Sequence, residues 1–151
     1  MPELRAALIV FPAKNLLSKS RMRLVTRCDK MKILLVDDLQ DSREVIRTMI
    51  ERLGHRVIEA TNGSEAVQLA VALKPDCILM DLNMPNVDGL LATAALRAIS
   101  PLRQIPIVAL TAYPRDMSRD KALAAGCDLY LQKPFSIVDL ELVLYNVSGP
   151  A

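Results

Sequence analysis

Five side chains with carboxylate, hydroxyl or amine groups each stand at, or just beyond, the end of a short apolar run. They are Asp37, Asp38, Asp81, Thr111 and Lys133. Carboxylates that lie together repel one another, so a site built from them needs a cation. Oxygen ligands without cysteine or histidine favour a hard ion, which is Mg²⁺ or alternatively Mn²⁺.

The chemistry that suits such a set is phosphoryl transfer. Mg²⁺ keeps several waters and is typically completed by a phosphate oxygen, and a lysine at the same rim supplies positive charge for phosphate. One carboxylate would be the nucleophile, while the metal and the lysine neutralise the oxygens of the transferred group. We therefore expect the five side chains to meet at one place in the fold.

From residue 31 onward, short apolar runs alternate with segments of helical periodicity. We expect strands over Ile33–Val36, Arg56–Ala60, Cys77–Met80, Ile107–Leu110 and Leu129–Leu131. We expect helices from Asp41 to a stop at Gly54, from about Gly63 to Leu73, over Leu90–Ile99, over Asp116–Ala125 with Gly126 as the stop, and after Ser136. This alternation predicts an α/β fold, a doubly wound, flavodoxin-like parallel sheet of five strands in the order 2-1-3-4-5 with helices on both faces. Ligands bind such sheets at the carboxyl ends of the strands, between strands 1 and 3.

Two of the expected helices begin with the spacing of a capping box, in which a polar residue is followed three residues later by an acid. The pairs are Asp41 with Glu44 and Ser136 with Asp139. In the first helix, one apolar face is expected to consist of Val45, Ile46, Met49, Ile50 and Leu53.

Five short motifs, in their order and spacing, resemble the response-regulator receiver family of two-component signalling over Met31–Val147. The motifs are Leu35-Val36-Asp37-Asp38, Met80-Asp81-Leu82-Asn83-Met84-Pro85, Asp88-Gly89, Leu110-Thr111-Ala112 and Lys133-Pro134-Phe135. Four of the five fall at the end of an expected strand, Asp88-Gly89 comes just before an expected helix, and no residue of the family's site is missing.

The resemblance implies a role for each acidic residue. Asp81 would accept a phosphoryl group from a sensor histidine kinase or a histidine phosphotransfer protein. Asp38, Asp81 and the backbone carbonyl of Asn83 would bind Mg²⁺ directly, and Asp37 would act mainly through water.

The resemblance also implies a switch. Lys133 would pair with the phosphoryl group, and Thr111 would move to hydrogen-bond it. Tyr130 stands at the position of the family's switch aromatic, and the Lys133–Pro134 peptide bond is predicted to be cis. The surface of helix 4, strand 5 and helix 5 would then change and bind a separate target protein, with self-association to a homodimer as another form of output.

The last helix is expected to carry the partner-binding face. Leu140, Val143, Leu144 and Val147 have the spacing of a core-facing stripe. The opposite side then carries a second apolar group, Val138, Leu142 and Tyr145, which would contact a partner unless the leader or a rotated helix covers it.

Charge divides the chain into two parts. Residues 1–30 hold seven basic and two acidic residues, whereas residues 31–151 hold twelve basic and fifteen acidic ones. We interpret 1–30 as a basic leader, either upstream of a native start at Met31 or a real extension, and 31–151 as the receiver domain. The leader, which lacks a periodic apolar face, is predicted to be dispensable.

Composition excludes several classes. Aromatic residues make up 3% of the chain and Trp is absent, which disfavours a single-stranded nucleic-acid binder. No apolar run approaches the roughly 18 residues of a membrane span. Three scattered cysteines indicate a reducing, cytoplasmic compartment and buried apolar roles. His55 is expected to be an ordinary loop residue, and Gly89 to provide backbone freedom.

The predicted function is that of a signalling phosphoacceptor, not an enzyme, acting on a separate partner because no output domain is expected after the last helix. A stand-alone regulator, a phosphorelay intermediate and a receiver from a hybrid kinase all fit. The alternative, a haloacid-dehalogenase-like phosphatase, would place Asp-x-Asp after its first strand, where this chain has adjacent aspartates. A flavodoxin-like nucleotide-binding protein would need a Gly- or hydroxyl-rich loop there.

Overall fold

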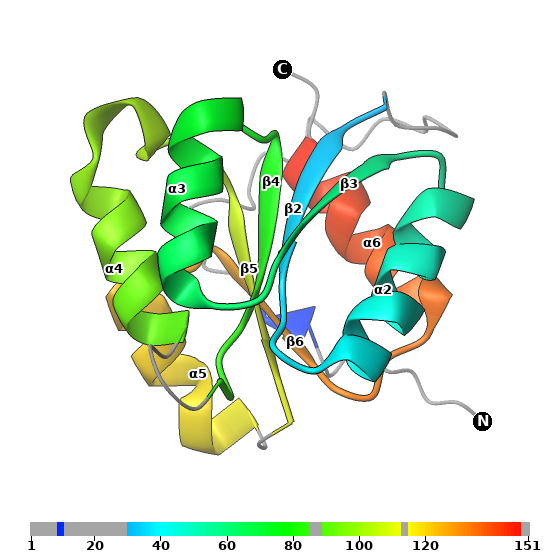
Figure 1. Ribbon diagram of the computed structural model, residues 1–151. Helices are drawn as coiled ribbons and strands as arrows, with labels where there is room; N and C mark the ends of the chain where they lie inside the picture. The colour runs from blue at the N-terminus through cyan, green and yellow to red at the C-terminus, as the bar shows by residue number, and fades with distance from the viewer. Residues whose placement is uncertain (1–8, 11–29, 85–88, 113–114, 149–151) are drawn as a thin grey trace.

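The computed structural model describes residues 9–10, 30–84, 89–112 and 115–148 (Figure 1). One of the three cysteines, Cys28, and two residues of the receiver motifs, Pro85 and Asp88, lie outside the described ranges. No helix in the described part of the chain is both long and apolar enough to span a bilayer.

Five parallel strands form the centre of the molecule. They are β2 (Lys32–Val36), β3 (Arg56–Ala60), β4 (Cys77–Asp81), β5 (Ile107–Thr111) and β6 (Leu129–Gln132). Their spatial order is β3-β2-β4-β5-β6, and every neighbouring pair is parallel. The predicted order 2-1-3-4-5 is therefore confirmed, and the switch point lies between β2 and β4.

A sixth strand, β1 (Ile9–Val10), extends the sheet at its β6 edge. It runs antiparallel to β6, with Ile9 opposite Leu131 and Val10 opposite Tyr130. The prediction of a five-stranded sheet omitted it, because two residues are too few to show a periodicity. The leader thus contributes one short edge strand to a sheet that is otherwise parallel.

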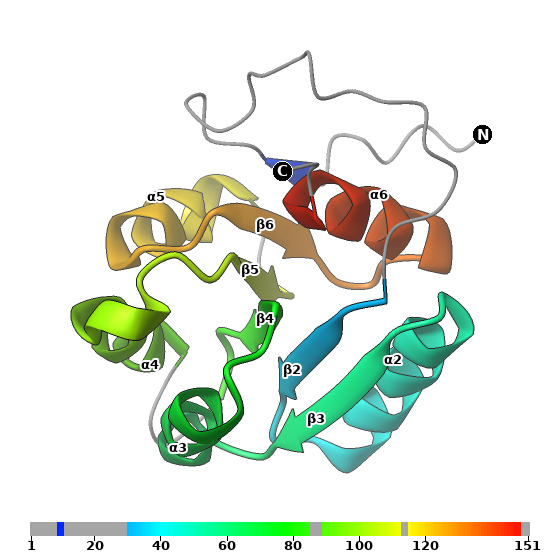
Figure 2. The same cartoon turned by 90° about the horizontal axis from the view of Figure 1, so that it is seen from above.

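Helices cover both faces of the sheet, as predicted (Figure 2). On one face lie α2 (Gln40–Arg52) and α6 (Ile137–Ser148). On the other lie α3 (Gly63–Leu73), α4 (Gly89–Ala98) and α5 (Arg115–Ala125), with a short 3-10 helix, η3 (Ser100–Leu102), after α4. Each of the five parallel strands consequently has an apolar layer on either side.

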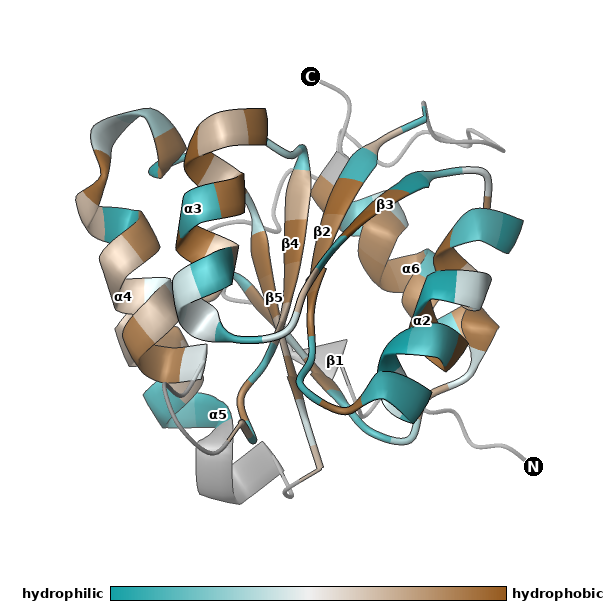
Figure 3. Cartoon of the chain, in the orientation of Figure 1, coloured by the Kyte–Doolittle hydropathy of each residue, from teal (hydrophilic) through white to brown (hydrophobic). Residues whose placement is uncertain are grey.

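Alternate residues of β2 show how the two layers are filled. Leu34 and Val36 belong to the cluster beneath α3, α4 and α5, whereas Ile33 and Leu35 belong to the cluster beneath α2 and α6. All four are fully buried. A parallel strand covered on both faces is mostly apolar, and the middle parts of β2 and β4 are accordingly brown in Figure 3.

Several helix ends match their sequence signals. Gly54 and Gly126 adopt φ of 92° and 118°, the left-handed conformation that glycine permits where α2 and α5 stop. Ser136 and Asp139 form the predicted capping box of α6. The Ser136 N–H donates to the Asp139 carboxylate at 2.9 Å, and the Asp139 N–H donates to the Ser136 hydroxyl at 3.1 Å.

The start of α2 differs from its prediction. The N-cap is Leu39, which makes no side-chain cap bond, and Asp41 lies inside the first turn. The chain turns into the helix earlier because the Leu39 N–H is already held by the Asp37 carboxylate at 3.0 Å. The apolar face is also narrower than predicted, since Val45 is 55% exposed.

Candidate functional site

Three carboxylates meet at the switch point of the sheet. Asp37 and Asp38 directly follow β2, and Asp81 is the last residue of β4, the strand beside it. One carboxylate oxygen from each lies within 4.8 Å of the others. Asp37 and Asp81 are buried, and Asp38 is half-buried. The topology therefore gathers the acidic residues that the sequence had singled out.

Lys133 completes this cluster from the loop after β6. Its Nζ lies 3.2 Å from Asp37 Oδ2 and 3.6 Å from Asp81 Oδ2. The Lys133–Pro134 peptide bond is cis, as predicted. The Lys133 N–H donates to the Thr111 carbonyl at 2.7 Å, which ties this loop to the end of β5. One ammonium thus faces two of the three carboxylates.

Burial raises the pKa of the Asp81 carboxyl to about 6. The Asn83 N–H, which donates to Asp81 Oδ1 at 2.8 Å, and the Lys133 ammonium pull this pKa down, whereas neighbouring Asp37 pushes it up. At neutral pH the carboxylate is ionised in a place that disfavours its charge. A divalent cation beside this carboxylate would stabilise its charge.

Thr111 and Tyr130 lie on the two strands beyond β4. In the β4–β5 register Asp81 is paired with Leu110, so Thr111 stands one residue further toward the acidic edge. Its side chain is fully buried. Tyr130 is also fully buried and belongs to the cluster under α3, α4 and α5.

Asn83 takes part in the site through its side chain as well as its backbone. Its Oδ1 accepts a hydrogen bond from the Ala112 N–H at 2.9 Å, which links the loop after β4 to the residue after Thr111. Only the backbone carbonyl of Asn83 was predicted to take part in the site. The side-chain link depends on the proximity of two loops, which no local pattern encodes.

The first turn of α2 also reaches the site, which the sequence analysis missed. Ser42 Oγ donates to Asp37 Oδ2 at 2.5 Å and accepts from Lys133 Nζ at 3.3 Å. Arg43 Nη1 donates to the Asp37 carbonyl at 2.9 Å, and Arg43 Nε pairs with Glu59 on β3 at 2.8 Å. The sequence offered one signal for Ser42, which is a polar residue five positions after Asp37, where the helix starts.

Other residues that the sequence singled out lie elsewhere. His55 is away from the acidic site, but it is buried, and its Nδ1 accepts the Met31 N–H at 3.0 Å. Its role is thus structural, though more specific than that of an ordinary loop residue. Cys77 and Cys127 are buried and unpaired, in agreement with their expected apolar role. On α6, Val138 and Leu142 are exposed whereas Tyr145 is half-buried.

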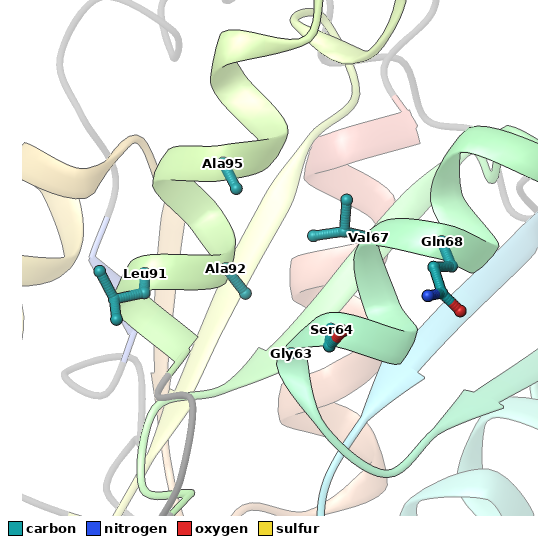
Figure 4. Close-up of a pocket in the computed structure, with 7 residues that line it drawn as sticks. All are labelled: Gly63, Ser64, Val67, Gln68, Leu91, Ala92 and Ala95. Carbon is teal, nitrogen blue, oxygen red and sulfur yellow. The ribbon is translucent and has the colours of Figure 1, made fainter.

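Away from the acidic cluster, a hollow of about 470 Å³ lies between α3 and α4 (Figure 4). Its lining is mainly apolar or small and includes Gly63, Val67, Leu91 and Ala92. It contains none of the acidic cluster's side chains. The site with the chemistry is therefore the acidic edge of the sheet and not this groove.

The donor set at the acidic edge fits a hard divalent cation. It supplies carboxylate oxygens and contains no sulfur or imidazole ligand. Three carboxylates against one nearby ammonium leave a net negative charge in a largely buried place, which a dication would neutralise.

The chain resembles known receivers in both sequence and fold. Residues 33–145 match the response regulator receiver domain family. A polar-differentiation response regulator, DivK, of Brucella anthropi is 36% identical over 105 residues, which cover 70% of this chain and 85% of that protein. The chain belongs to the response-regulator receiver family. This leaves the haloacid-dehalogenase-like alternative without support.

Solved structures agree with this assignment. The receiver domain of a Pseudomonas aeruginosa sensor histidine kinase, solved with a magnesium ion coordinated in its active-site cleft, has a TM-score of 0.75 and 38% identity, covering 80% of this chain and 98% of that one. The chemotaxis protein CheY4 of Vibrio cholerae has a TM-score of 0.75 and 30% identity, covering 79% and 99%. The particular protein described here is thus a receiver similar in sequence to DivK and in structure to CheY4.

Proposed function

We propose that this receiver accepts a phosphoryl group on Asp81 from a histidine kinase or a histidine phosphotransfer protein, with Mg²⁺ bound beside it. The observation that carries the proposal is the meeting of the Asp37, Asp38 and Asp81 carboxylates, with Lys133 Nζ 3.6 Å from Asp81. The chain would act as a cytoplasmic signalling phosphoacceptor and not as an enzyme that turns over a substrate.

In the transfer, an oxygen of Asp81 forms the new bond to phosphorus. The bond from phosphorus to the donor's histidine nitrogen breaks, and its electron pair stays on the nitrogen. Lys133 Nζ is close enough to Asp81 to pair with an oxygen of the transferred group. Asp38, Asp81 and the Asn83 carbonyl would hold Mg²⁺, which supplies positive charge for the phosphoryl oxygens.

Asp37 differs from the other two carboxylates, because its oxygens already accept three hydrogen bonds. The donors are the Leu39 N–H, the Ser42 hydroxyl and the Lys133 ammonium. With so few lone pairs left, Asp37 would act on the metal through water, whereas Asp38 would bind it directly.

Thr111 and Tyr130 would convert phosphorylation into a surface change. Thr111 precedes Ala112, whose N–H is held by the loop after Asp81, so a new group on Asp81 would act on the end of β5. Tyr130 lies on β6, one strand further out. The target protein would contact the surface of α5, β6 and α6, which corresponds to helix 4, strand 5 and helix 5 of the receiver core.

The direct test is labelling with acetyl phosphate in the presence of Mg²⁺. Mass spectrometry should show one added phosphoryl group on the wild type and none on Asp81→Asn. Asp120 is an exposed aspartate on α5, so Asp120→Asn is the matched control and should be labelled like the wild type. Persistent labelling of Asp81→Asn would place the acceptor elsewhere.

The metal proposal has its own test in thermal unfolding. For an affinity on the order of 1 mM, 10 mM Mg²⁺ would stabilise the fold by roughly 1.4 kcal/mol through mass action. Asp38→Ala should abolish that gain, because it removes a direct ligand. A wild-type melting temperature that is the same with and without Mg²⁺ would argue against the site.

A further inference from the structure

Asp37 is a buried carboxylate whose two oxygens are both engaged. Oδ1 accepts the Leu39 N–H at 3.0 Å. Oδ2 accepts from Ser42 Oγ at 2.5 Å and from Lys133 Nζ at 3.2 Å. Hydrogen bonds to an ionised acceptor are short and strong, so these donors fix the rotation of a carboxylate at the centre of the acidic cluster.

Ser42 has a second contact, with Lys133. The ammonium lies 3.3 Å from Ser42 Oγ, and an ammonium can only donate. The hydroxyl therefore accepts from Lys133 and gives its own proton to Asp37, which closes a ring of three side chains. Lys133 Nζ is nearer to Asp37 and Ser42 than to Asp81, which is 3.6 Å away.

We propose that Ser42 is a positioning residue for the metal and phosphoryl site. It would hold the Asp37 carboxylate in one rotation and keep the Lys133 ammonium close to Asp37. The ammonium would then not approach Asp81 Oδ2 more closely, and that oxygen would remain accessible to the cation. This inference rests on the proposed function. It adds a group from α2 to the acidic cluster, which is otherwise built from strand ends and the loops after β4 and β6.

The reason is electrostatic. Without the hydroxyl, Asp37 Oδ2 keeps Lys133 as its partner, and the carboxylate gains rotational freedom. The ammonium loses one of its two hydrogen-bond acceptors and shifts toward Asp81, the nearest other anion. There it competes with a divalent cation for the same oxygen, and Mg²⁺ binds more weakly.

The backbone at Asp37 has an independent anchor. Arg43 donates to the Asp37 carbonyl at 2.9 Å, and its guanidinium is held by Glu59 at 2.8 Å. The main chain is therefore expected to stay in place when Ser42 is changed. An effect of the substitution would come from the side chains of the ring.

The test compares Ser42→Ala and Ser42→Thr with the wild type in calorimetric Mg²⁺ titrations. Loss of a partner that orients a metal site typically weakens metal affinity 10–100-fold, so we expect the Mg²⁺ Kd of Ser42→Ala to rise roughly tenfold. Ser42→Thr keeps a hydroxyl on the same carbon and should bind Mg²⁺ within about twofold of the wild type. Ser64→Ala, at an exposed serine in the first turn of α3, is the control and should leave the Kd unchanged.

A second readout is the Mg²⁺ dependence of labelling by acetyl phosphate. Ser42→Ala should shift the Mg²⁺ concentration that gives half-maximal rate upward by about the same factor, with a smaller change in the rate at saturating Mg²⁺. A purely structural role would lower the melting temperature and leave both Mg²⁺ measurements at wild-type values, and that result would overturn the inference. Equal loss of affinity in Ser42→Ala and Ser42→Thr would overturn it too.

The titration uses no phosphoryl donor, so the two proposals can fail separately. If the wild type is labelled at Asp81 but Ser42→Ala binds Mg²⁺ normally, only the role of Ser42 is wrong. If Ser42→Ala weakens Mg²⁺ binding but the wild type is not labelled, only the phosphoacceptor function is wrong. A wild type that binds no Mg²⁺ overturns both.

Discussion

His55 makes a hydrogen bond that requires its neutral form. Its Nδ1 accepts the Met31 N–H, and burial lowers the pKa of the ring from 6.5. Between the lowered pKa and 6.5 the unfolded chain binds more protons than the folded one, so stability falls as pH falls. The contribution of His55 is thus fully present above pH 6.5 and is lost at lower pH.

We therefore expect the free energy of unfolding to decline less steeply from pH 7.5 to pH 5.5 in His55→Asn than in the wild type. The Asn amide oxygen can accept the same N–H and does not titrate. The raised pKa of Asp81 has the opposite effect on stability, because it favours the folded state as pH falls. This effect is the same in the wild type and in His55→Asn, so it does not alter the difference between them. Denaturant titrations at a series of pH values measure the difference, and equal slopes would contradict the assignment.

Gly89 is required for close approach and not, as the sequence suggested, for backbone freedom. A Cβ at this position would clash with the Asp81 carbonyl oxygen and would lie 2.9 Å from Leu82 Cδ2. We expect Gly89→Ala to push α4 away from the end of β4, to lower the free energy of unfolding by about 1–3 kcal/mol and to slow labelling of Asp81.

The matched control is Gly54→Ala, at a glycine with φ of 92° and open space around it. Backbone strain there should cost about 1–2 kcal/mol without affecting Asp81 labelling. Denaturation and labelling of both variants separate the two effects. Normal labelling of Gly89→Ala, with a stability like that of the wild type, would show that the helix can shift without consequence.

At the residue scale, the sequence predicted the side chains that stand at strand ends and missed those that reach them from elsewhere. Asp37, Asp81 and Lys133 could be found because parallel strands bring their carboxyl ends to one edge. The Asn83 side chain could not be predicted, because its partner comes from another loop and the contact depends on side-chain geometry. Ser42 offered one local signal, a polar residue where the helix starts, but its contacts with Asp37 and Lys133 also depend on side-chain geometry.

At the element scale, helix α6 shows two apolar faces. Leu140, Val143 and Leu144 are fully or almost fully buried against the sheet, as predicted. On the other side, Val138 and Leu142 are 58% and 46% exposed. Adjacent exposed apolar side chains suggest a contact surface.

We expect Leu142→Glu to fold normally and to lose phosphorylation-dependent association. The measurement is light scattering and pull-down, with and without beryllium fluoride as a phosphoryl mimic. Val71→Glu, at an exposed apolar residue of α3 on the opposite face of the sheet, is the control. If Leu142→Glu associates as the wild type does, α6 is not the output surface.

Most element boundaries followed from periodicity because each element buries a continuous apolar face. β3 and α3 have the predicted bounds, and the other parallel strands differ by one residue at an end. The errors lie where tertiary contacts decide. α2 starts early because of Asp37, and β1 exists because β6 offers an unpaired edge.

At the scale of the whole molecule, the question is what the leader contributes. Among the residues whose side chains the structure describes, the members of both apolar clusters come from Met31 onward. From the leader, the pairing of Ile9–Val10 with β6 adds a two-residue antiparallel ladder at the sheet edge. A net contribution of about 0.5–1.5 kcal/mol per hydrogen bond makes this a small part of the stability.

A chain that begins at Met31 is therefore expected to fold, to lose no more than about 2 kcal/mol of unfolding free energy and to be labelled at Asp81 like the full chain. Its new amino group can still donate to His55, which preserves the contact at the start of β2. Removing β1 uncovers the edge of β6, so the shortened chain should also self-associate more readily at high concentration.

Val10→Pro in the full chain is the control, because proline cannot continue the ladder and leaves the rest of the leader intact. Denaturation, labelling and light scattering on the three proteins test this. Loss of folding or of labelling in the shortened chain, with Val10→Pro unaffected, would show that leader residues other than β1 support the domain.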